Sequence, residues 1–540
     1  MTEGWNFADV WETAAEIRGE KPALVQGSRR IDWRAFERRA SGIARTLIDA
    51  GLTEQSKFAQ YLYNCPEYLE SVFASFKAGI VPVNTNYRYE DRELLYLWDN
   101  SDTEAIVFHG VFSERLERLR DQLSGVRLFL WVDDGSGPKP DWAVDYEEAA
   151  RSAAPGDTGS GPWGRSGDHL YMLYTGGTTG MPKGVMWRQD DLYRVFALST
   201  GADASEVDLS AVRRRLASTE GPVGIPACPL MHGTGAITSF QILNMGGCVV
   251  TLMSRSFDPI ELLDTIERER VNSVSIVGDA FAKPILRALD DNPGRWDLSS
   301  LRMMISSGVM WSKQTKEGLL KHNPSMMLVD AFSSSEALGM GQSVSAGSGA
   351  LRTGKFMLGD RAIVIREDGT RLEPGSGEIG LVALRGPNPI GYYKDPEKTA
   401  RTFKVIDGER YVVPGDYARL ESDGTITLLG RGSVCINTGG EKVFPEEVEE
   451  VLKEHRGVRD AVVVGVPDER FGEAVTALVE LESGADLRPE DLVSHTKQRL
   501  AGYKAPKHVI FVDSVRRAPS GKVDYAMLKK LAEEKVKAAG

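Results

Sequence analysis

The hydrophobic pattern along the chain changes repeatedly between a helical spacing and short, continuous apolar runs. Residues 34–50 carry apolar positions at helical spacing and stop before Gly51, which predicts a helix ending there. A second helix is predicted for 260–270. Short apolar runs typical of strands lie at 105–109, 128–132, 248–252 and 273–277. Strands and helices that alternate in this way indicate an α/β fold with much parallel sheet.

The pattern also divides the chain into a long and a short part. Residues 133–168 are rich in Gly, Asp, Ser and Pro and predict a surface excursion. Near residue 430 the sequence pattern changes. The residues after it predict a helix of their own at 446–455 and a strand at 461–466. That is enough for a small separate domain. We therefore expect a large domain over 1–430 and a small one over 431–540.

Composition excludes several classes of protein. The net charge of -12 disfavours a nucleic-acid partner, which usually needs a basic face. No apolar run approaches the roughly 20 residues that cross a bilayer, and the acidic N-terminus lacks the regions of a signal peptide. The four cysteines lie far apart with no CxxC pair, which argues against a zinc site or a disulfide framework. The expected location is a reducing cytoplasm.

Candidate chemistry enters with YTGGTTGMPKGV at 174–185, which follows an apolar run. Glycines let backbone N–H groups converge on one point, and such a nest binds anions. The threonine hydroxyls and the ammonium of Lys183 complete the composition of a phosphate cradle. Lys183 stands between Pro182 and Gly184, so the segment is neither a Walker A loop nor a dinucleotide fingerprint. A plain surface turn is the alternative.

This segment resembles the signature loop of the adenylate-forming superfamily, which includes acyl-CoA synthetases, peptide-synthetase adenylation domains and luciferases. It departs from the usual pattern once, with Gly176 in place of a serine. The segments at 81–89 (VPVNTNYRY) and 391–403 (GYYKDPEKTARTF) are also similar, so the resemblance covers nearly the whole chain. GRGSVCINTGGEKVFPEEVE at 430–449 makes it strongest to actinobacterial acyl-CoA ligases, including those that activate steroid side-chain carboxylates.

The resemblance implies a fold, a nucleotide site and a metal. The fold would be a large multi-layer N-terminal domain with mixed sheets flanked by helices, plus a small, mobile α+β C-terminal domain. Glu336, in DAFSSSEA, would hold Mg²⁺ at the ATP phosphates together with Thr178, since a carboxylate suits this hard cation. The other loop residues that would contact ATP are Thr175, Gly176, Gly177, Thr179, Gly180 and Lys183. The expected neighbours of the adenosine are Ser307, Gly308, Asp330, Ala331, Phe332 and Ser335.

Further motifs follow in the order that the resemblance requires. Asp416 would accept hydrogen bonds from both ribose hydroxyls, as an ionised carboxylate can, and Arg431 would contact ribose or phosphate. Ser433 stands at the position of the family hinge, where Asp or Lys is usual. The Gly439–Gly440 turn would approach the pantetheine arm of CoA after the small domain has turned. For these glycines a simple turn before the next helix is the alternative.

Two further residues are candidates for catalysis. Lys522, in APSGKVDYAML, matches the family's C-terminal Ser-Gly-Lys, and its ammonium would bridge the carboxylate substrate and the α-phosphate, besides contacting ATP. A solvated surface lysine is the alternative. His232, in CPLMHGTG, matches a position where the family often has His or an aromatic residue, and would orient the carboxylate. Ordinary packing beside apolar residues is the alternative for this histidine.

The expected acyl pocket is lined by small residues, which suggests room for a long or bulky acid. Asp279 interrupts this apolar wall and would suit a polar substituent; a strand-end carboxylate facing water is the alternative. The expected lining is His232, Gly233, Gly235, Ala236, Gly278 and Asp279.

The expected reaction is the AMP-forming ligation of a carboxylic acid to CoA. The acid, medium- or long-chain fatty or a steroid side-chain acid, would react with ATP to give an acyl-adenylate and diphosphate. The thiol of CoA would then displace AMP. The main alternative is an adenylating enzyme that passes the acyl group to an amine or a carrier-protein arm. The expected partners are the acid, ATP with Mg²⁺, and CoA, with a homodimer left open.

Overall fold

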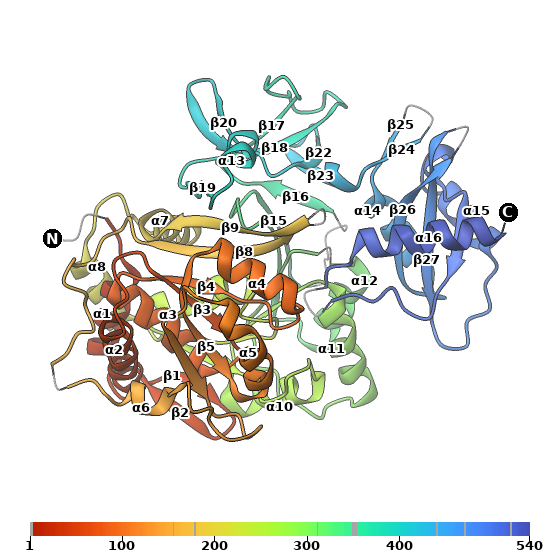
Figure 1. The fold of residues 1–540 in the computed structure, drawn as a ribbon. Helices are drawn as coiled ribbons and strands as arrows, with labels where there is room; N and C mark the ends of the chain where they lie inside the picture. Colours follow the sequence, from red (N-terminus) through yellow and green to blue (C-terminus); the bar gives the residue numbers. More distant parts are fainter. Residues whose placement is uncertain are drawn as a thin grey trace.

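The computed structural model describes residues 4–154, 156–177, 180–309, 311–347, 354–438, 441–468, 471–518 and 521–539. In these ranges the strands form three sheets, two in the long N-terminal part and one in the short C-terminal part. Figure 1 shows the C-terminal part, in blue, standing beside the main body. The α/β class expected from the alternating pattern is confirmed.

The largest sheet changes from parallel to antiparallel along its width. Its neighbouring strands run parallel from β1 to β14 and antiparallel from β14 to its far edge. In order across the sheet, the strands are β2 (Arg29–Asp32), β1 (Pro22–Gln26), β11 (Cys248–Thr251), β10 (Val223–Pro226), β12 (Ser273–Ile276), β13 (Met303–Ser307), β14 (Met327–Phe332), β15 (Gly341–Ser345), β16 (Lys355–Leu358), β23 (Thr425–Arg431), β22 (Asp416–Leu420), β18 (Ile379–Arg385), β21 (Glu409–Val412) and β20 (Phe403–Ile406), with β17 (Ala362–Ile365) paired to β18.

The second sheet of the main body is parallel except at one edge, where β8, β9 and β19 pair antiparallel. In order, its strands are β19 (Gly391–Tyr392), β9 (Gly180–Arg188), β8 (Leu170–Gly177), β4 (Val81–Asn84), β3 (Lys57–Tyr61), β5 (Thr103–His109), β6 (Leu128–Val132) and β7 (Val144–Asp145).

Helices of the main body pack on these sheets and on one another (Figure 1). They are α1 (Phe7–Arg18), α2 (Trp33–Asp49), α3 (Pro66–Ala78), α4 (Asp91–Asn100), α5 (Ser113–Leu119), α6 (Tyr146–Ala150), α7 (Gln189–Thr200), α8 (Leu209–Ser218), α9 (Gly233–Asn244), α10 (Pro259–Glu269), α11 (Asp279–Asp291), α12 (Lys313–His322) and α13 (Pro396–Thr402).

The two helices predicted from apolar spacing are confirmed, and their starts have local causes. Asp32 accepts a hydrogen bond from the backbone N–H of Ala35 at 2.7 Å and caps α2. Asp258 caps α10 in the same way, and Pro259 takes the first helical position, where no intrahelical N–H bond is lost. The four short apolar runs form β5, β6, β11 and β12, as predicted.

Helix α3 lies at the centre of the main body, and all of its residues are buried. Its charged side chains are paired, as burial of charge requires. Lys77 forms ion pairs with Glu12 and Glu37, and Glu70 accepts hydrogen bonds from Arg39 at 2.6 and 3.0 Å. Aromatic rings from α1, α2, α3 and α9 pack around this helix and form the main core.

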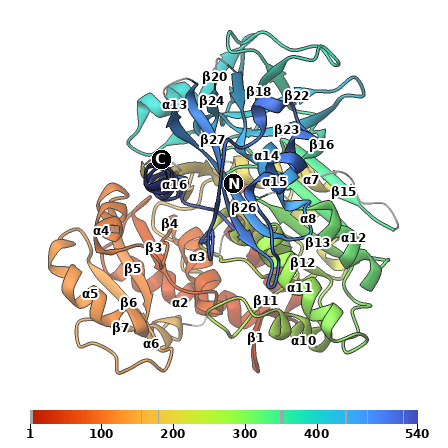
Figure 2. The same ribbon diagram turned by 90° about the vertical axis from the view of Figure 1, so that its right-hand side faces the viewer.

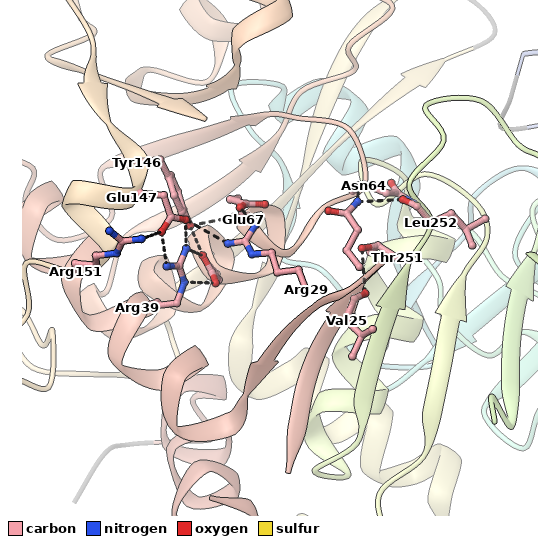
Figure 3. A network of polar contacts seen from close by, with 12 residues as sticks. Val25, Arg29, Arg39, Asn64, Glu67, Tyr146, Glu147, Arg151, Thr251 and Leu252 are labelled. Carbon is pink, nitrogen blue, oxygen red and sulfur yellow. Dashed lines mark hydrogen bonds and ion pairs between the residues drawn. The ribbon is translucent and has the colours of Figure 1, made fainter. Parts of the chain in front are cut away.

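The predicted surface excursion at 133–168 is only partly a surface loop. It contains β7 and α6, and Tyr146 in α6 is buried and donates a hydrogen bond to Glu70 at 3.1 Å. Figure 3 shows why this segment is held in place: Arg39 of α2 reaches Glu147 of α6 at 2.6 and 2.8 Å while it also binds Glu70. Buried partners on α2 and α3 therefore order a segment whose composition alone predicts a loop.

The C-terminal part has its own sheet and core. Val458–Asp468 (β26) and Gly472–Leu481 (β27) form a long antiparallel pair, and buried valines on them pack against the helices. The remaining strands are β25 (Glu441–Val443), β24 (Ile436–Thr438) and β28 (His508–Phe511), and the helices are α14 (Pro445–Lys453), α15 (Pro489–Lys497) and α16 (Tyr525–Ala539). The predicted helix at 446–455 and strand at 461–466 are confirmed as α14 and β26.

The C-terminal part contacts the main body at several places, among them α11 and β23. The ammonium of Lys283 in α11 donates to the backbone carbonyl of Arg459 at 3.0 Å, and one turn later Arg287 pairs with Glu482 at 3.1 Å. Figure 2 views the molecule from this side and has the blue C-terminal part in front of the main body. The two parts are therefore seen in one defined orientation, with specific bonds between them.

Candidate active site

The glycine-rich segment forms the hairpin between β8 and β9. Thr175 lies opposite Lys183 in this antiparallel pair. The hairpin joins strand to strand and leads into no helix, so its geometry also differs from a Walker A loop. Of the predicted phosphate-binding residues, Gly176, Gly177 and Gly180 lie at the ends of the two strands, and Thr178 and Thr179 lie outside the described residues.

Lys183 has an ion-pair partner that could not be predicted from the sequence. Its ammonium forms an ion pair with Asp395, the residue that caps the start of α13. The lysine lowers the pKa of Asp395, mainly through this hydrogen bond, so the carboxylate stays charged. Lys183 is about one-third exposed and Asp395 less so. The ammonium is thus held at the base of the hairpin by a bond that an anionic ligand would compete for.

Glu336 lies just after β14 and is almost fully buried. The hydroxyl of Tyr392 donates to its Oε1 at 2.6 Å, and the indole of Trp187 donates to the backbone carbonyl of Ser335 at 2.9 Å. Both donors belong to the sheet that carries the glycine-rich hairpin. The two sheets therefore meet at DAFSSSEA, which places the glutamate beside the hairpin.

Lys398 adds a further cation near this carboxylate. Its ammonium lies 4.4 Å from the centre of the Tyr392 ring, a cation–π contact. Partial burial lowers the pKa of Lys398, and Lys183 and Arg431 act in the same direction, while Glu336 and Asp395 oppose them. Within the described chain no carboxylate lies within 4.0 Å of this ammonium.

Asp416 and Arg431 face each other across the antiparallel pair β22–β23. The Nε of Arg431 donates to Oδ1 of Asp416 at 3.3 Å. The other oxygen, Oδ2, is buried and has no hydrogen-bond partner among the described residues. Burial raises the pKa of Asp416, and Arg431 acts against this rise. A buried acceptor without a donor needs an explanation, and a ligand hydroxyl would provide it.

Lys522 reaches this site from the C-terminal part. Gly521 packs so closely that an added Cβ would lie 3.1 Å from Val277 and 3.2 Å from Val309 of the main body. The side chain of Lys522 keeps access to solvent. Desolvation of its ammonium by the surrounding protein lowers the pKa of Lys522, and the charge of Arg431 lowers it further, while the charge of Glu336 raises it. Three groups far apart in the sequence thus act on one another electrostatically.

His232 lies immediately before α9 and near the hairpin. Burial lowers the pKa of His232 to about 3, and the positive charges of Lys522 and Arg88 act in the same direction. The imidazole is therefore neutral at physiological pH, which suits hydrogen bonding and not proton donation. Asn84 ties the region together, because its side-chain amide donates to the carbonyls of Tyr174 and Met231 at 2.9 and 2.7 Å.

The predicted adenosine neighbours lie on adjacent strands. Ser307 pairs with Ala331 across β13 and β14, and Gly308 follows with a φ of +94°, which favours glycine. Phe332 is buried, its ring 5.6 Å from that of Phe356. Asp330 is buried beside Lys316 at 3.8 Å, and burial raises its pKa to about 7. Its carboxyl already has a cationic neighbour, which leaves its role toward a nucleotide a prediction.

Packing explains several residues of the expected acyl pocket. An added Cβ on Gly235 would lie 2.5 Å from the carbonyl of Pro229, and Ala236 is fully buried in the main core. Asp279 begins α11 and accepts hydrogen bonds from the N–H and hydroxyl of Ser312 at 3.2 and 3.0 Å. Gly233 lies at the start of α9 and Gly278 just before α11. Packing thus accounts for the small residues at Gly235 and Ala236, and the acyl pocket stays a prediction.

The remaining predicted site residues are less well placed. Ser433 lies in a short turn between β23 and β24, and its side chain is not described. The turn Gly439–Gly440 lies outside the described residues. Among the residues that the structure describes, no three His, Cys, Asp or Glu side chains are grouped closely enough to hold a metal ion. Nor does any described helix have the length and apolar character needed to cross a bilayer.

A cavity of about 270 Å³ lies elsewhere, beside α6. Its arginine is already paired: Arg29 binds Glu67 and Glu147, the latter at 3.2 Å (Figure 3). It is lined by Arg29, Glu67, Val132, Asp133, Asp145, Tyr146 and Glu147. The cation of this lining is thus already paired with two carboxylates, and the candidate site remains the meeting point of the hairpin, Glu336, Asp416 and Lys522.

Sequence reasoning missed three residues of this site: Tyr392, Asp395 and Lys398. All three belong to GYYKDPEKTARTF, which was singled out only as a similar segment. The signal was present, because a motif that follows the glycine-rich loop with two lysines and a Tyr-Tyr pair carries chemistry as well as structure. Its pairing with the hairpin through β19 is long-range and could not be read from spacing.

Comparisons with known proteins show the family to which the chain belongs. A family model described as AMP-binding enzyme matches residues 11–393, and one described as AMP-binding enzyme C-terminal domain matches 447–522. A "Medium/long-chain-fatty-acid–CoA/3-oxocholest-4-en-26-oate–CoA ligase" of Mycolicibacterium smegmatis is 39% identical over 539 residues, covering 98% of this chain and 97% of its own. A "3-oxocholest-4-en-26-oate–CoA ligase" of Rhodococcus rhodochrous is 40% identical, covering 97% and 95%.

Among solved structures, the anthranilate CoA ligase AuaEII in complex with anthranoyl-AMP superposes with a TM-score of 0.83 and covers 99% of each chain. At 20% identity, this likeness concerns the fold alone. The family model over most of the chain and the full-length relatives carry the assignment. The chain belongs to the family of AMP-binding enzymes.

Proposed function

We propose that the protein is an AMP-forming acyl-CoA ligase, which joins a carboxylic acid to CoA through an acyl-adenylate. The observation that carries the proposal is the buried oxygen of Asp416, beside Arg431, that has no partner among the described residues, together with the packing of Gly521, next to Lys522, on Val277 and Val309 of the main body. A cation delivered by a second domain next to a nucleotide-type site is what adenylation of an anionic acid needs. The full-length relatives named as CoA ligases support CoA as the acceptor.

In the first half-reaction, a carboxylate oxygen of the acid forms a bond to the α-phosphorus of ATP, and the bond to the bridging β-phosphate oxygen breaks. Diphosphate leaves with the electron pair. Repulsion between two anions opposes this step, and Lys522, Lys183 and Arg431 would offset it. Such preorganised charge is usually the largest catalytic contribution. Glu336, a hard carboxylate positioned by Tyr392, fits Mg²⁺, which would supply further neutralisation when bound with ATP.

In the second half-reaction, the CoA thiolate sulfur forms a bond to the acyl carbon, and the bond from that carbon to the AMP oxygen breaks. Lys522 is not needed here, because the phosphate leaves as an already stable anion. We infer that the C-terminal domain, from about residue 431 onward, turns near Ser433 between the two steps and brings Gly439 and Gly440 toward CoA. The bonds of Lys283 and Arg287 to the C-terminal part then belong to the adenylating orientation.

For the acid, we propose a medium- or long-chain fatty acid or a steroid side-chain carboxylate. The printed names of relatives that are 39% and 40% identical over nearly their whole length support this class. A homodimer, Mg²⁺ dependence and a cytoplasmic location remain proposals from the sequence.

The first test is mass spectrometry of reactions with ATP, Mg²⁺ and a pool of acids, run with and without CoA. The pool holds short, medium and long fatty acids, aryl acids and a steroid side-chain acid. A new acyl-CoA mass only in the presence of CoA is the expected result and identifies the acid. Acyl-adenylate in both reactions without thioester would contradict CoA ligation and favour an amine or carrier-protein acceptor.

Lys522→Ala tests the division of labour between the two steps. Loss of one preorganised cation is expected to lower adenylation, measured as diphosphate release, by about 10²–10³-fold. Thiolation of a supplied acyl-adenylate should stay within about twofold of the unmodified enzyme, because Lys522 takes no part in it. Equal loss in both half-reactions would contradict the alternation of the two orientations.

A further inference from the structure

The turn that carries Lys522 is held by a small set of bonds. The backbone N–H of Ala518 donates to the carbonyl of Lys522 at 2.8 Å, and the N–H of Gly521 donates back to the carbonyl of Ala518 at 2.8 Å. Gly521 has a φ of +72° and lies against Val277 and Val309 of the main body. The position of the ammonium therefore depends on how this turn is anchored on its other side.

Arg517 provides that anchor. Its guanidinium binds Asp460 with two hydrogen bonds, from Nε at 2.6 Å and from Nη2 at 2.9 Å. The third nitrogen, Nη1, donates to the carbonyl of Gly521 at 3.1 Å, directly before Lys522. Both side chains of the pair are mostly buried, at 17% and 20% exposure. A planar fork that holds a carboxylate and a carbonyl at once fixes the turn more tightly than a point charge would.

The same anchor leads back to the main body. Asp460 follows Arg459 in β26, and the carbonyl of Arg459 accepts the hydrogen bond from Lys283 of α11. A continuous path of bonds and backbone thus runs from α11 through the start of β26 and Arg517 to the turn of Lys522. Docking of the C-terminal part on α11 and delivery of the ammonium are mechanically linked by this path.

We propose that Arg517 is a positioning residue for adenylation, acting through Lys522. It sets where the ammonium stands when the C-terminal part is docked, and it plays no role once that part has turned away. This inference rests on the proposed function, because it gives the Lys522 turn a task only in the adenylating half-reaction.

Arg517→Ala is the direct test, with Arg516→Ala as the matched control. Arg516 is the neighbouring arginine, is exposed, and forms no ion pair within the described chain. Misplacement of a reacting group by about 1 Å costs up to roughly 100-fold. Arg517→Ala should therefore lower kcat of adenylation by about 10–100-fold with little change in the KM for ATP. Thiolation of a supplied acyl-adenylate should change by less than about twofold, and Arg516→Ala should change neither.

A double variant separates positioning from a general loss of structure. If Arg517 acts only through Lys522, Arg517→Ala adds no further loss to adenylation in a protein that already carries Lys522→Ala. A further loss in the double variant, or equal losses in both half-reactions of Arg517→Ala, would overturn the inference while leaving the proposed function intact. Normal adenylation by Lys522→Ala alone would overturn the role of Lys522 and with it this inference, while acyl-CoA ligation itself would stand.

Asp460→Asn is the second variant, which serves if Arg517→Ala does not fold. This change keeps the size of the Asp460 side chain and removes its charge, so the guanidinium of Arg517 is bound less tightly. We expect the same selective loss in adenylation, but smaller, and again none in thiolation. An unchanged adenylation rate in Asp460→Asn would count against the anchor.

Discussion

The hydroxyl of Tyr392 sets how Glu336 is presented, because it donates to one carboxylate oxygen at 2.6 Å. A hydrogen bond to a charged group is worth about 1.5–3 kcal/mol. Tyr392→Phe should therefore reduce adenylation by about 10–100-fold and raise the Mg²⁺ concentration needed for half-maximal rate. The measurement is diphosphate release at a series of Mg²⁺ concentrations.

Tyr393→Phe is the matched control for this variant. Its hydroxyl donates to Asp102, also at 2.6 Å, but this bond lies at the surface of the main body. The control should leave the Mg²⁺ dependence unchanged. If the two phenylalanine variants showed the same Mg²⁺ dependence of diphosphate release, the role given to Tyr392 would be contradicted.

A second single-residue prediction concerns the unpartnered oxygen of Asp416. Asp416→Asn puts an amide where two ribose hydroxyls would donate, so the KM for ATP should rise by about tenfold or more, with less change in kcat. The unmodified enzyme should also use 2′-deoxy- and 3′-deoxy-ATP poorly, and the variant should lose this preference. Asp423→Asn, an exposed aspartate in the adjoining turn, should change neither. If Asp416→Asn still preferred ATP over the two deoxy analogues, Asp416 would not be the residue that binds the ribose hydroxyls.

At the scale of elements, the helices and strands followed from local pattern, and the order of the strands did not. Apolar spacing and a capping aspartate were enough to place α2 and α10. By contrast, β10 lies between β11 and β12 in the largest sheet, and β16 pairs with β23 some seventy residues later. Such pairings are decided by packing between distant segments, which no local window contains. The ordering of α6 by buried partners on α2 and α3 has the same cause.

The contact between α14 and β23 makes an element-scale prediction about pH. Glu446, in the first turn of α14, packs directly against Gly430 of β23. Its Oε2 has no hydrogen-bond partner in the described chain. Burial, followed by the charges of Glu449 and Asp416, raises the pKa of Glu446 to about 8. Between pH 4.5 and about 8 the folded state therefore holds a proton that the unfolded state releases. This glutamate thus makes the free energy of unfolding fall as pH rises through that window.

Glu446→Gln removes this titration and should stabilise the protein near pH 8. The thermal unfolding midpoint of the variant should exceed that of the unmodified protein by a few degrees at pH 8, and by less at pH 5. Glu441→Gln, an exposed glutamate shortly before α14, should give no such difference. A constant gap between variant and unmodified protein across this range would mean that Glu446 is charged in both states.

At the scale of the whole molecule, motifs indicated the residues of the site but not how they meet. Lys522 was a candidate from Ser-Gly-Lys alone, yet its approach to Glu336 depends on docking between two parts of the chain. The bonds that hold this docking, from Lys283 and Arg287, come from residues with no motif. In the sequence they look like ordinary surface cations of a helix, and only the fold shows that they bond to the C-terminal part. The acyl pocket expected from the sequence stays a prediction, because packing alone accounts for the small residues at Gly235 and Ala236.

The docked orientation can be fixed covalently, which tests whether one orientation serves both half-reactions. Arg287 is exposed, Glu482 is partly exposed, and the two face each other between the two parts, so cysteines at these positions can be joined by a bismaleimide. Cys435 should be replaced by serine, since the other native cysteines are buried. The joined enzyme should release about one equivalent of diphosphate and hold acyl-adenylate, because Lys522 stays at the site. It should form no acyl-CoA, because the C-terminal domain cannot turn.

The chemistry of the linker has to be separated from its constraint. The same double-cysteine variant treated with a monofunctional maleimide carries the same groups without the link, and should form acyl-CoA at the rate of the untreated variant. Acyl-CoA formation at that rate by the joined enzyme would mean that thiolation occurs in the adenylating orientation, and rotation near Ser433 would then be unnecessary. Loss of both half-reactions on joining would show instead that adenylation itself needs freedom between α11 and β27, so the docked orientation would be a resting state and not the adenylating one.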